Sequence, residues 1–236
     1  MASEDAAVVA GLEMLGKIAP TPRSRFDDIC RAGAAILILA VGGSCLAWGQ
    51  TAASDAPIAQ APSYRIGDRW IVMYGKTAVA SVVTSVTDTR TTFSETKNGG
   101  VPFEMLFYAQ GNVVRSGDTS YDPCLCSLSF PMNVGKNWDS KWTVRNPSGS
   151  HESEAHVSVE AFEQVSVRAG AFDAFKIVMH GISTYAGNGR FVVPWDATFW
   201  YAPEVKRVVK SEAVFYVRYQ GSHKEGFELS EFSLAR

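Results

Sequence analysis

The chain has 236 residues, of which 46% are hydrophobic and 19% are charged, and its formal net charge at pH 7 is -2. This length accommodates one medium-sized domain together with an export segment. No cluster of lysines and arginines is evident, and phosphate binding needs a concentrated basic surface. We therefore expect no nucleic-acid partner.

An uncharged, apolar stretch near the N-terminus predicts export from the cytoplasm. No charged side chain occurs between Ala32 and Ala53, and arginines precede the stretch at positions 23, 25 and 31. This order, followed by Ala47-Trp48-Gly49 as a small-x-small cleavage site, is typical of a signal sequence. The arginines are expected to stay in the cytoplasm while the rest of the chain crosses the membrane.

Other interpretations of residues 1–49 stay open. The uncharged run is near the length of a spanning helix, which also fits an uncleaved anchor in the inner membrane. Cys45 follows Gly43-Ser44 as in a lipoprotein site, although Gly42 stands where leucine is expected, and Met14 is a more conventional start than Met1. A cleaved signal sequence, an uncleaved anchor and a lipoprotein site all place the remaining chain in the periplasm or outside the cell, with membrane contact only through this segment. The other interpretation is that this segment forms a buried helix of a cytosolic protein.

The chain after this apolar helix is expected to form one β-rich domain. Residues 50–63 are rich in Ala, Pro, Ser and Gln and predict a flexible linker, so the domain is expected at residues 64–236. There, β-branched and aromatic runs are separated by turn residues, and no segment has the 3.6-residue periodicity of a capped helix. We predict an all-β or β-dominated fold, an antiparallel meander forming a half-barrel, a barrel or a sandwich.

The first half of the domain predicts several short strands. Arg69–Tyr74 is the first, and residues 76–96 predict two strands with a turn near Thr87-Asp88-Thr89. Apolar residues alternate with others at positions 101, 103, 105 and 107, which indicates a strand with one apolar face. Another strand is expected from Val113. Tyr121-Asp122-Pro123 predicts a turn, and strands are expected at residues 138–144 and 155–165.

The most regular pattern lies at residues 165–210 and predicts consecutive antiparallel strands. Ala169-Gly170 predicts a turn or bulge, because glycine reaches positive φ at little cost. The glycine-rich residues 187–189 predict a hairpin turn. Pro194 indicates an edge strand or a bulge, and Pro203 a strand end, because proline cannot donate to a ladder. Period-two geometry predicts opposite faces for two pairs of side chains, Phe172 with Ala174 and Phe175 with Ile177. Further strands are expected at residues 205–219 and 227–234.

Cys124 and Cys126 form the sharpest local feature that bears on chemistry. On a regular strand their Cα atoms lie about 6.6 Å apart, at the outer limit for a disulfide unless the turn at Pro123 brings them closer. The pair is expected to be a structural crosslink or two buried thiols. A reducible bond used in redox chemistry is the alternative. Two thiolates do not complete a metal site, so we expect no metal there.

Signals for catalysis are weak. His151 and His156 are an odd number of positions apart, which suits neither one strand face nor the helical pattern of zinc proteases. The sequence has no G-x-S-x-G elbow and no glycine-rich phosphate loop. The carboxylates of Asp173, Asp196, Glu204 and Glu212 do not differ in context from outward-facing strand residues. Enzymatic activity stays open, a non-catalytic role is favoured, and no cofactor is expected.

Aromatic residues cluster within one short stretch and suggest either a packed core or an apolar ligand groove. Because small barrels often hold ligands inside or at their mouths, a groove is expected to involve these side chains. They are Trp195, Phe199, Trp200 and Tyr201.

Three motifs resemble a family of bacterial exported domains of unknown function. They are F-P-x-x-V-G-K-x-W at residues 130–138, V-x-A-G-x-F-x-A-x-K at 167–176 and W-Y-A-P-x-V-x-x-V-V-K at 200–210. The resemblance implies no catalytic residues. At the level of fold, the family is similar to half-barrels that carry lipoproteins or lipids.

Together these observations predict an exported, non-catalytic domain that binds an apolar or amphipathic ligand, such as a lipid, or a protein partner in the cell envelope. The alternative is a structural or interaction module of the envelope without a small-molecule site. A redox protein that uses Cys124 and Cys126 is a third, less favoured hypothesis.

Overall fold

The computed structural model describes residues 57–186, 191–218 and 221–236. Over these residues the chain forms twelve strands and a 3₁₀ helix, η2. Their bounds are β1 Arg69–Tyr74, β2 Thr77–Val86, β3 Arg90–Lys97, β4 Phe103–Tyr108, β5 Val113–Ser116, β6 Thr119–Leu125, β7 Asn137–Asn146, β8 Gly149–Val167, β9 Gly170–Tyr185, β10 Phe191–Ala202, η2 Pro203–Val205, β11 Arg207–Val217 and β12 Gly221–Ser233.

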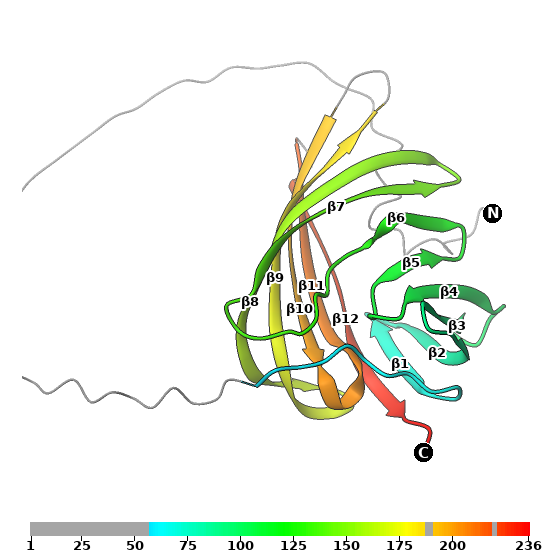
Figure 1. The fold of residues 1–236 in the computed structure, drawn as a ribbon. Coiled ribbons are helices and arrows are strands. Elements are labelled where there is room, and N and C mark those ends of the chain that lie inside the picture. Colours follow the sequence, from blue (N-terminus) through cyan, green and yellow to red (C-terminus); the bar gives the residue numbers. More distant parts are fainter. Residues whose placement is uncertain (1–56, 187–190, 219–220) are drawn as a thin grey trace, which may run out of the picture.

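Each strand pairs antiparallel with the strands before and after it, and β1 pairs with β12, so the sheet closes into a barrel. The mostly longer strands β7 to β12 form a tall curved wall, and the mostly shorter strands β1 to β6 form the wall opposite (Figure 1). The predicted β-dominated antiparallel meander is therefore confirmed, in its barrel form. Among the described residues, none belongs to a helix with the length and apolarity needed to span a membrane.

The strand predictions for the first half of the domain hold in most places. The first strand has the predicted bounds, and residues 76–96 contain β2 and β3 with a turn between them. Two details were wrong. Tyr121-Asp122-Pro123, predicted as a turn, lies within β6, and the strand predicted at residues 155–165 begins earlier, at Gly149. His151 and Ser153 face the interior of the barrel, and this polar inner face hides the alternation that marks a half-apolar strand.

The predicted N-terminal segment and part of the predicted linker lie outside the described residues, as does the turn at residues 187–189. Residues 57–63 are described, and they belong to the folded unit. Ala59 is buried and forms a β-bridge with Met132, with N···O distances of 2.9 and 2.8 Å in the two directions. The domain therefore begins before Tyr64, because the backbone of this segment is paired inside the fold.

Both faces of the β8–β9 hairpin are buried near its tip. Phe172 and Ala174 pack in one apolar cluster, and Phe175 and Ile177 pack in the other, as the alternation predicted. The tip also folds against β12: the Ala169 N–H donates to the Leu229 carbonyl oxygen at 3.1 Å, and an Arg168–Glu228 ion pair lies beside it at 2.6 Å. The predicted turn occupies residues 168 and 169, directly before Gly170, whose φ is +135°.

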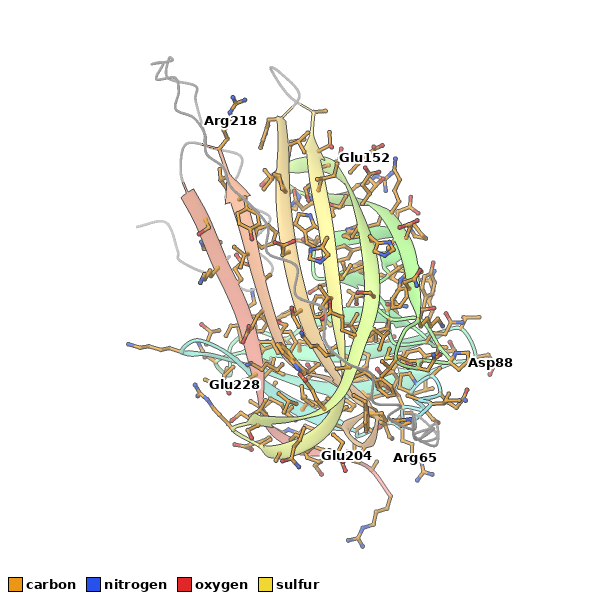
Figure 2. The ribbon with its side chains drawn as sticks, turned by 90° about the vertical axis from the view of Figure 1, so that its left-hand side faces the viewer. Arg65, Asp88, Glu152, Glu204, Arg218 and Glu228 are labelled. Carbon is orange, nitrogen blue, oxygen red and sulfur yellow. A yellow bond between two sulfur atoms is a disulfide. The ribbon has the colours of Figure 1, made fainter. Side chains whose placement is uncertain are left out.

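Pro194 and Pro203 lie at positions where the strand pairing does not require a backbone N–H, which proline lacks. Pro194 lies one residue before the pairing of β10 with β11 begins at Trp195, so one side of it is edge-like. Pro203 ends β10 and opens η2. Charged side chains lie around the outside of the ribbon, as the labelled residues in Figure 2 show, while the inner faces carry the two apolar clusters.

Candidate functional site: the barrel cavity and its strap

A cavity of about 280 Å³ lies inside the barrel, between the wall of β1 to β6 and the wall of β10 to β12. The period-two alternation of the strands places one set of side chains in it. The predicted apolar face of β4 is confirmed here, since Phe103, Met105 and Phe107 all line the cavity. Most other lining residues are apolar too: Val72, Val79, Val113, Leu125, Leu128, Phe199, Val208, Ala213 and Phe227.

Arg207 lies against an aromatic layer at one boundary of this cavity. Its guanidinium carbon is 5.2 Å from the ring centroid of Trp70, 5.4 Å from that of Phe93 and 5.5 Å from that of Phe107. Tyr64 packs edge-on against the same three rings. The ring faces attract the cation electrostatically, and their rigid packing orients its side chain.

Glu95 on β3 is the carboxylate beside Arg207. Its Oε1 lies 3.9 Å from Arg207 Nη2, an ion pair without a hydrogen bond, and it accepts a short hydrogen bond from the Ser81 hydroxyl. Both carboxylate and hydroxyl are buried. Burial raises the pKa of the cavity-lining Tyr74 far above its usual value, and the charge of Glu95 raises it further. The apolar cavity thus contains one polar corner.

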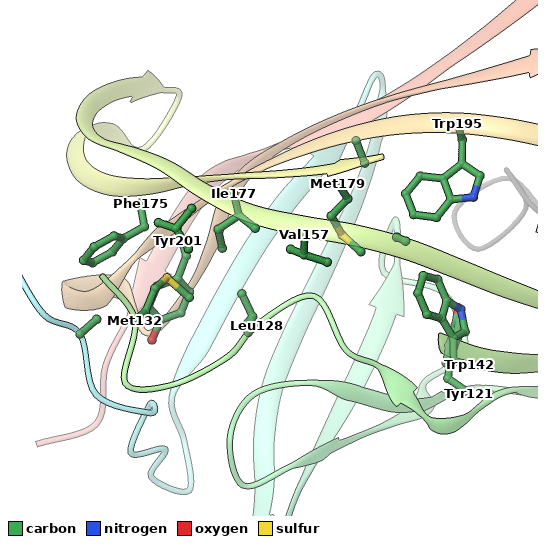
Figure 3. Packing of buried hydrophobic residues seen from close by; sticks show 14 of the residues in the cluster. Tyr121, Leu128, Met132, Trp142, Val157, Phe175, Ile177, Met179, Trp195 and Tyr201 are labelled. Atoms are coloured by element: carbon green, nitrogen blue, oxygen red, sulfur yellow. The ribbon is translucent and has the colours of Figure 1, made fainter. Parts of the chain in front are cut away.

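At the seam between β6 and β7 the two strands pair over only part of their lengths. These strands pair only from Ser120 to Asp122, opposite residues 143–145, and then separate. Residues 126–136, which we call the strap, cross the gap. Figure 3 shows the strap side chains Leu128 and Met132 directed toward Val157, Ile177 and their neighbours on the tall wall. The strap therefore replaces strand pairing with side-chain packing.

Asn112 holds the strap in place. Its Nδ2 donates to the Leu128 carbonyl oxygen and its Oδ1 accepts from the Leu128 N–H, both at 2.9 Å and both buried. Leu128 lines the cavity and also packs in the cluster of the tall wall. Further along the chain, the Trp138 indole N–H donates to the Cys126 carbonyl oxygen at 3.2 Å.

Replacing Asn112 with alanine is expected to lower the free energy of unfolding by roughly 2–4 kcal/mol, because a buried N–H and a buried carbonyl of Leu128 lose their partners. The matched control is Asn133→Ala, whose side chain is exposed, with an expected change within about 0.5 kcal/mol. Urea denaturation measures both. Equal stability of the two variants would show that Asn112 does not hold the strap.

Cys124 and Cys126 form a disulfide at the start of the strap. Their Cα atoms are 5.0 Å apart, closer than on a regular strand. Cys126 lies beyond the end of β6 at Leu125, so the chain has already left strand geometry at the second cysteine. The crosslink fixes the point at which the chain leaves β6 for the strap.

The four aromatic residues predicted for a groove are separated in the structure. Phe199 lines the cavity. Trp195 and Tyr201 are buried in the cluster of the tall wall, where the Trp195 indole lies over Gly181 so closely that a Cβ on that glycine would come within 2.3 Å of the ring. Trp200 donates from its indole N–H to Glu163 at 2.8 Å, and Lys210 lies over its ring.

The histidines take separate places. His156 and His180 are exposed cross-strand partners, hydrogen-bonded to Asp139 at 2.8 Å and Asp196 at 2.6 Å, beside a shallow outer depression of about 830 Å³. His151 faces inward against the Tyr185 ring, and burial lowers its pKa to about 4. Within the described ranges, no three His, Cys, Asp or Glu side chains are placed to hold a metal ion.

The carboxylates considered from the sequence have separate surroundings. Hydrogen bonds from His180 and Tyr216 lower the pKa of Asp196, and Glu212 pairs with Lys210 at 2.7 Å. Asp173 and Glu204 are exposed. The polar residues that do enter the cavity were not singled out in the sequence. Glu95 had a usable signal, because alternation places it on the same face as Phe93; Arg207 had none, because a bulge between Trp200 and Tyr201 shifts the register of β11.

Comparisons with known proteins bear on the fold. No family model matches the sequence, and no curated protein matches it. A solved structure described as a putative lipoprotein from Parabacteroides distasonis superposes with a TM-score of 0.51 and 11% identity, over 75% of this chain and 100% of that chain.

Two weaker matches have related descriptions. A putative exported protein with a YmcC-like fold from Bacteroides fragilis gives a TM-score of 0.49 at 15% identity, over 74% of this chain and 99% of that chain. The hypothetical lipoprotein YmcC from Escherichia coli gives 0.39 at 11%, over 75% and 88%. The chain adopts a fold similar to that of the Parabacteroides protein.

Proposed function

We propose that this protein is a non-catalytic domain of the cell envelope whose barrel cavity binds an apolar or amphipathic ligand. The observation that carries the proposal is the cavity of about 280 Å³ inside a closed barrel, lined mainly by apolar side chains from both walls. Small barrels use such interiors to hold one small ligand, and apolar lining with few polar groups is typical of ligand pockets.

Two observations support the envelope location. The N-terminal 49 residues have the order of a signal sequence, with arginines before an uncharged apolar run. The fold is similar to that of a protein described as a putative lipoprotein. We place the domain in the periplasm or outside the cell, and anchoring by an uncleaved N-terminal segment is the alternative within the same proposal.

We propose that the ligand enters at the seam between β6 and β7, where the two strands pair over only part of their lengths. Only three residue pairs join these strands, whereas β8 and β9 pair along sixteen positions on β9. Leu128 on the strap contacts the cavity directly. Displacement of the strap therefore breaks side-chain packing and the Asn112 hydrogen bonds, while most of the ladder stays intact.

A cavity-filling substitution tests the proposal. The uncharged fluorophore N-phenyl-1-naphthylamine is expected to bind the wild-type domain saturably, and Ala213→Trp is expected to abolish this binding because Ala213 lines the cavity. The matched control is Ala80→Trp, at a partly exposed position between the buried Val79 and Ser81, so that its side chain faces outward. Circular dichroism confirms that both variants fold.

The outcomes are distinct. Binding that is lost in Ala213→Trp and retained in Ala80→Trp supports the cavity as the site. Unchanged binding in Ala213→Trp, or no binding by the wild type, contradicts it and favours an envelope interaction module without a small-molecule site.

A further inference from the structure

We infer that the cavity accepts a single-chain amphiphile with an anionic head group, a carboxylate or a phosphate monoester, and that Arg207 binds this head. The inference rests on the proposed function and specifies its ligand. It starts from the polar corner of the cavity, where donors outnumber the acceptors that the described residues offer.

Arg207 is a largely buried cation without hydrogen bonds to the described part of the chain. Its side chain is only 14% exposed, yet its nearest carboxylate oxygen, on Glu95, is 3.9 Å away. Nη1 is buried and has no partner. The guanidinium has five N–H donors, and the faces of Trp70, Phe93 and Phe107 compensate its charge without accepting conventional hydrogen bonds. Such a group in a native structure indicates a missing partner, either water or a ligand.

A second donor lies on the same cavity surface. The Ser116 hydroxyl is buried without a hydrogen-bond partner in the described residues, and Ser116 lines the cavity together with Arg207. A planar guanidinium matches the two oxygens of a carboxylate or phosphate in a bidentate arrangement, and a hydroxyl can donate to the same anion. The unused donors of this cavity therefore suit an acceptor-rich, negatively charged head.

A cationic head suits the cavity less well, because Arg207 repels it and each cavity carboxylate already has a partner for one of its oxygens. Glu95 accepts from Ser81, and Glu225, the other carboxylate on the cavity, pairs with His223 at 2.8 Å. Ser211 uses its hydroxyl oxygen to accept from the Phe227 N–H at 3.3 Å. What the corner lacks is an acceptor for Arg207.

The remaining lining restricts the rest of the ligand. Val72, Met105, Phe199, Val208 and Phe227 present apolar surface on opposite sides of the cavity. A volume of about 280 Å³ lies at the small end of ordinary ligand pockets. It fits one aliphatic chain, and a lipid with several acyl chains does not fit inside the barrel.

Head-group competition tests the inference. The experiment titrates decanoate, decyl phosphate, decanol or decylamine, which share a ten-carbon chain, against N-phenyl-1-naphthylamine bound to the wild type at pH 7.5. Decanoate or decyl phosphate is expected to bind at least about 10-fold more tightly than decanol, since hydrogen bonds to charged groups are stronger than those between neutral groups. The comparison of the two anions separates a carboxylate from a phosphate ligand.

Two substitutions are expected to change the affinity for the anion in opposite directions. Arg207→Gln is expected to weaken the anion that binds best by at least about 10-fold and to leave decanol unchanged, because only the charge-assisted bonds are lost. Glu95→Gln is expected to tighten binding of the same anion, since it removes the competing negative charge. Arg145→Gln, at an exposed position paired with Asp122, is the matched control.

Equal affinities of wild type for decanoate, decyl phosphate and decanol would overturn the inference, as would a loss in Arg207→Gln that is the same for every head group. Either result leaves saturable binding of the neutral fluorophore, and so the proposed function, intact. Because the wild-type comparison needs no variant, the inference stays testable if Arg207→Gln does not fold.

Discussion

Asp68→Ala is expected to lower the free energy of unfolding by roughly 3–5 kcal/mol, the usual cost of breaking a buried ion pair from one side. Asp68 is fully buried and lies 2.8 Å from Lys206 Nζ. It also accepts from the backbone N–H groups of Arg65 at 2.9 Å and Ala235 at 2.8 Å. One carboxylate thus joins the segment before β1, the end of η2 and the C-terminal residues after β12.

Two variants separate charge from hydrogen bonding at this position. Asp68→Asn keeps one acceptor and removes the charge, so its expected loss is smaller, about 1–3 kcal/mol. Asp88→Ala changes an exposed aspartate at the β2–β3 turn, labelled in Figure 2, and is expected to stay within about 0.5 kcal/mol of wild type. Guanidinium denaturation measures all three, and a loss below about 1 kcal/mol for Asp68→Ala would contradict the assigned role.

The same carboxylate makes stability depend on pH in a defined direction. Burial alone would raise the pKa of Asp68, but hydrogen bonds from Lys206 and the two backbone amides outweigh it, and the net pKa lies below its usual value. A lowered folded-state pKa contributes stability above the unfolded-state pKa of about 3.9, and this stability is lost as the pH falls through the folded-state value. The difference between wild type and Asp68→Asn is therefore expected to shrink below about pH 4.

Trp70→Ala is expected to cost about 3–5 kcal/mol, the range for removing a large buried aromatic side chain. Trp70 is fully buried on β1, its indole N–H donates to the Val205 carbonyl oxygen at 2.9 Å, and its ring supports Arg207. The bond to Val205 spans 135 positions of sequence and ties the closing strand to η2.

Trp70→Phe keeps a ring in the layer but loses this donor, so about 1–3 kcal/mol is expected from the unpaired carbonyl. Val101→Ala, at a side chain that is 87% exposed, serves as the control with little change expected. Urea denaturation distinguishes the three variants. Equal losses in Trp70→Phe and Trp70→Ala would assign the effect to the hydrogen bond rather than to packing.

Local sequence patterns predicted some of the residues that line the cavity and not others. Alternation along β4 predicted the apolar face of Phe103, Met105 and Phe107, which the cavity uses. The aromatic cluster of β10 was singled out as a unit, yet only Phe199 lines the cavity. Trp195 and Tyr201 pack in the apolar cluster of the tall wall, and Trp200 is buried in the other apolar cluster. Whether an inward-facing side chain lines the cavity depends on the side chains of the opposite wall. The sequence pattern of a single strand does not predict this.

The amino-acid sequence by itself determined the β-rich class, most strand positions and the opposite faces of the β9 side chains, because period-two alternation and turn residues act over a few neighbours. Only the tertiary structure decided that β1 pairs with β12, that residues 126–136 bridge the seam, and that Arg207 and Glu95 share one corner. These features join residues far apart in the chain. They arise when the sheet curls and closes, which requires one interior volume to be filled by all twelve strands of the described domain together.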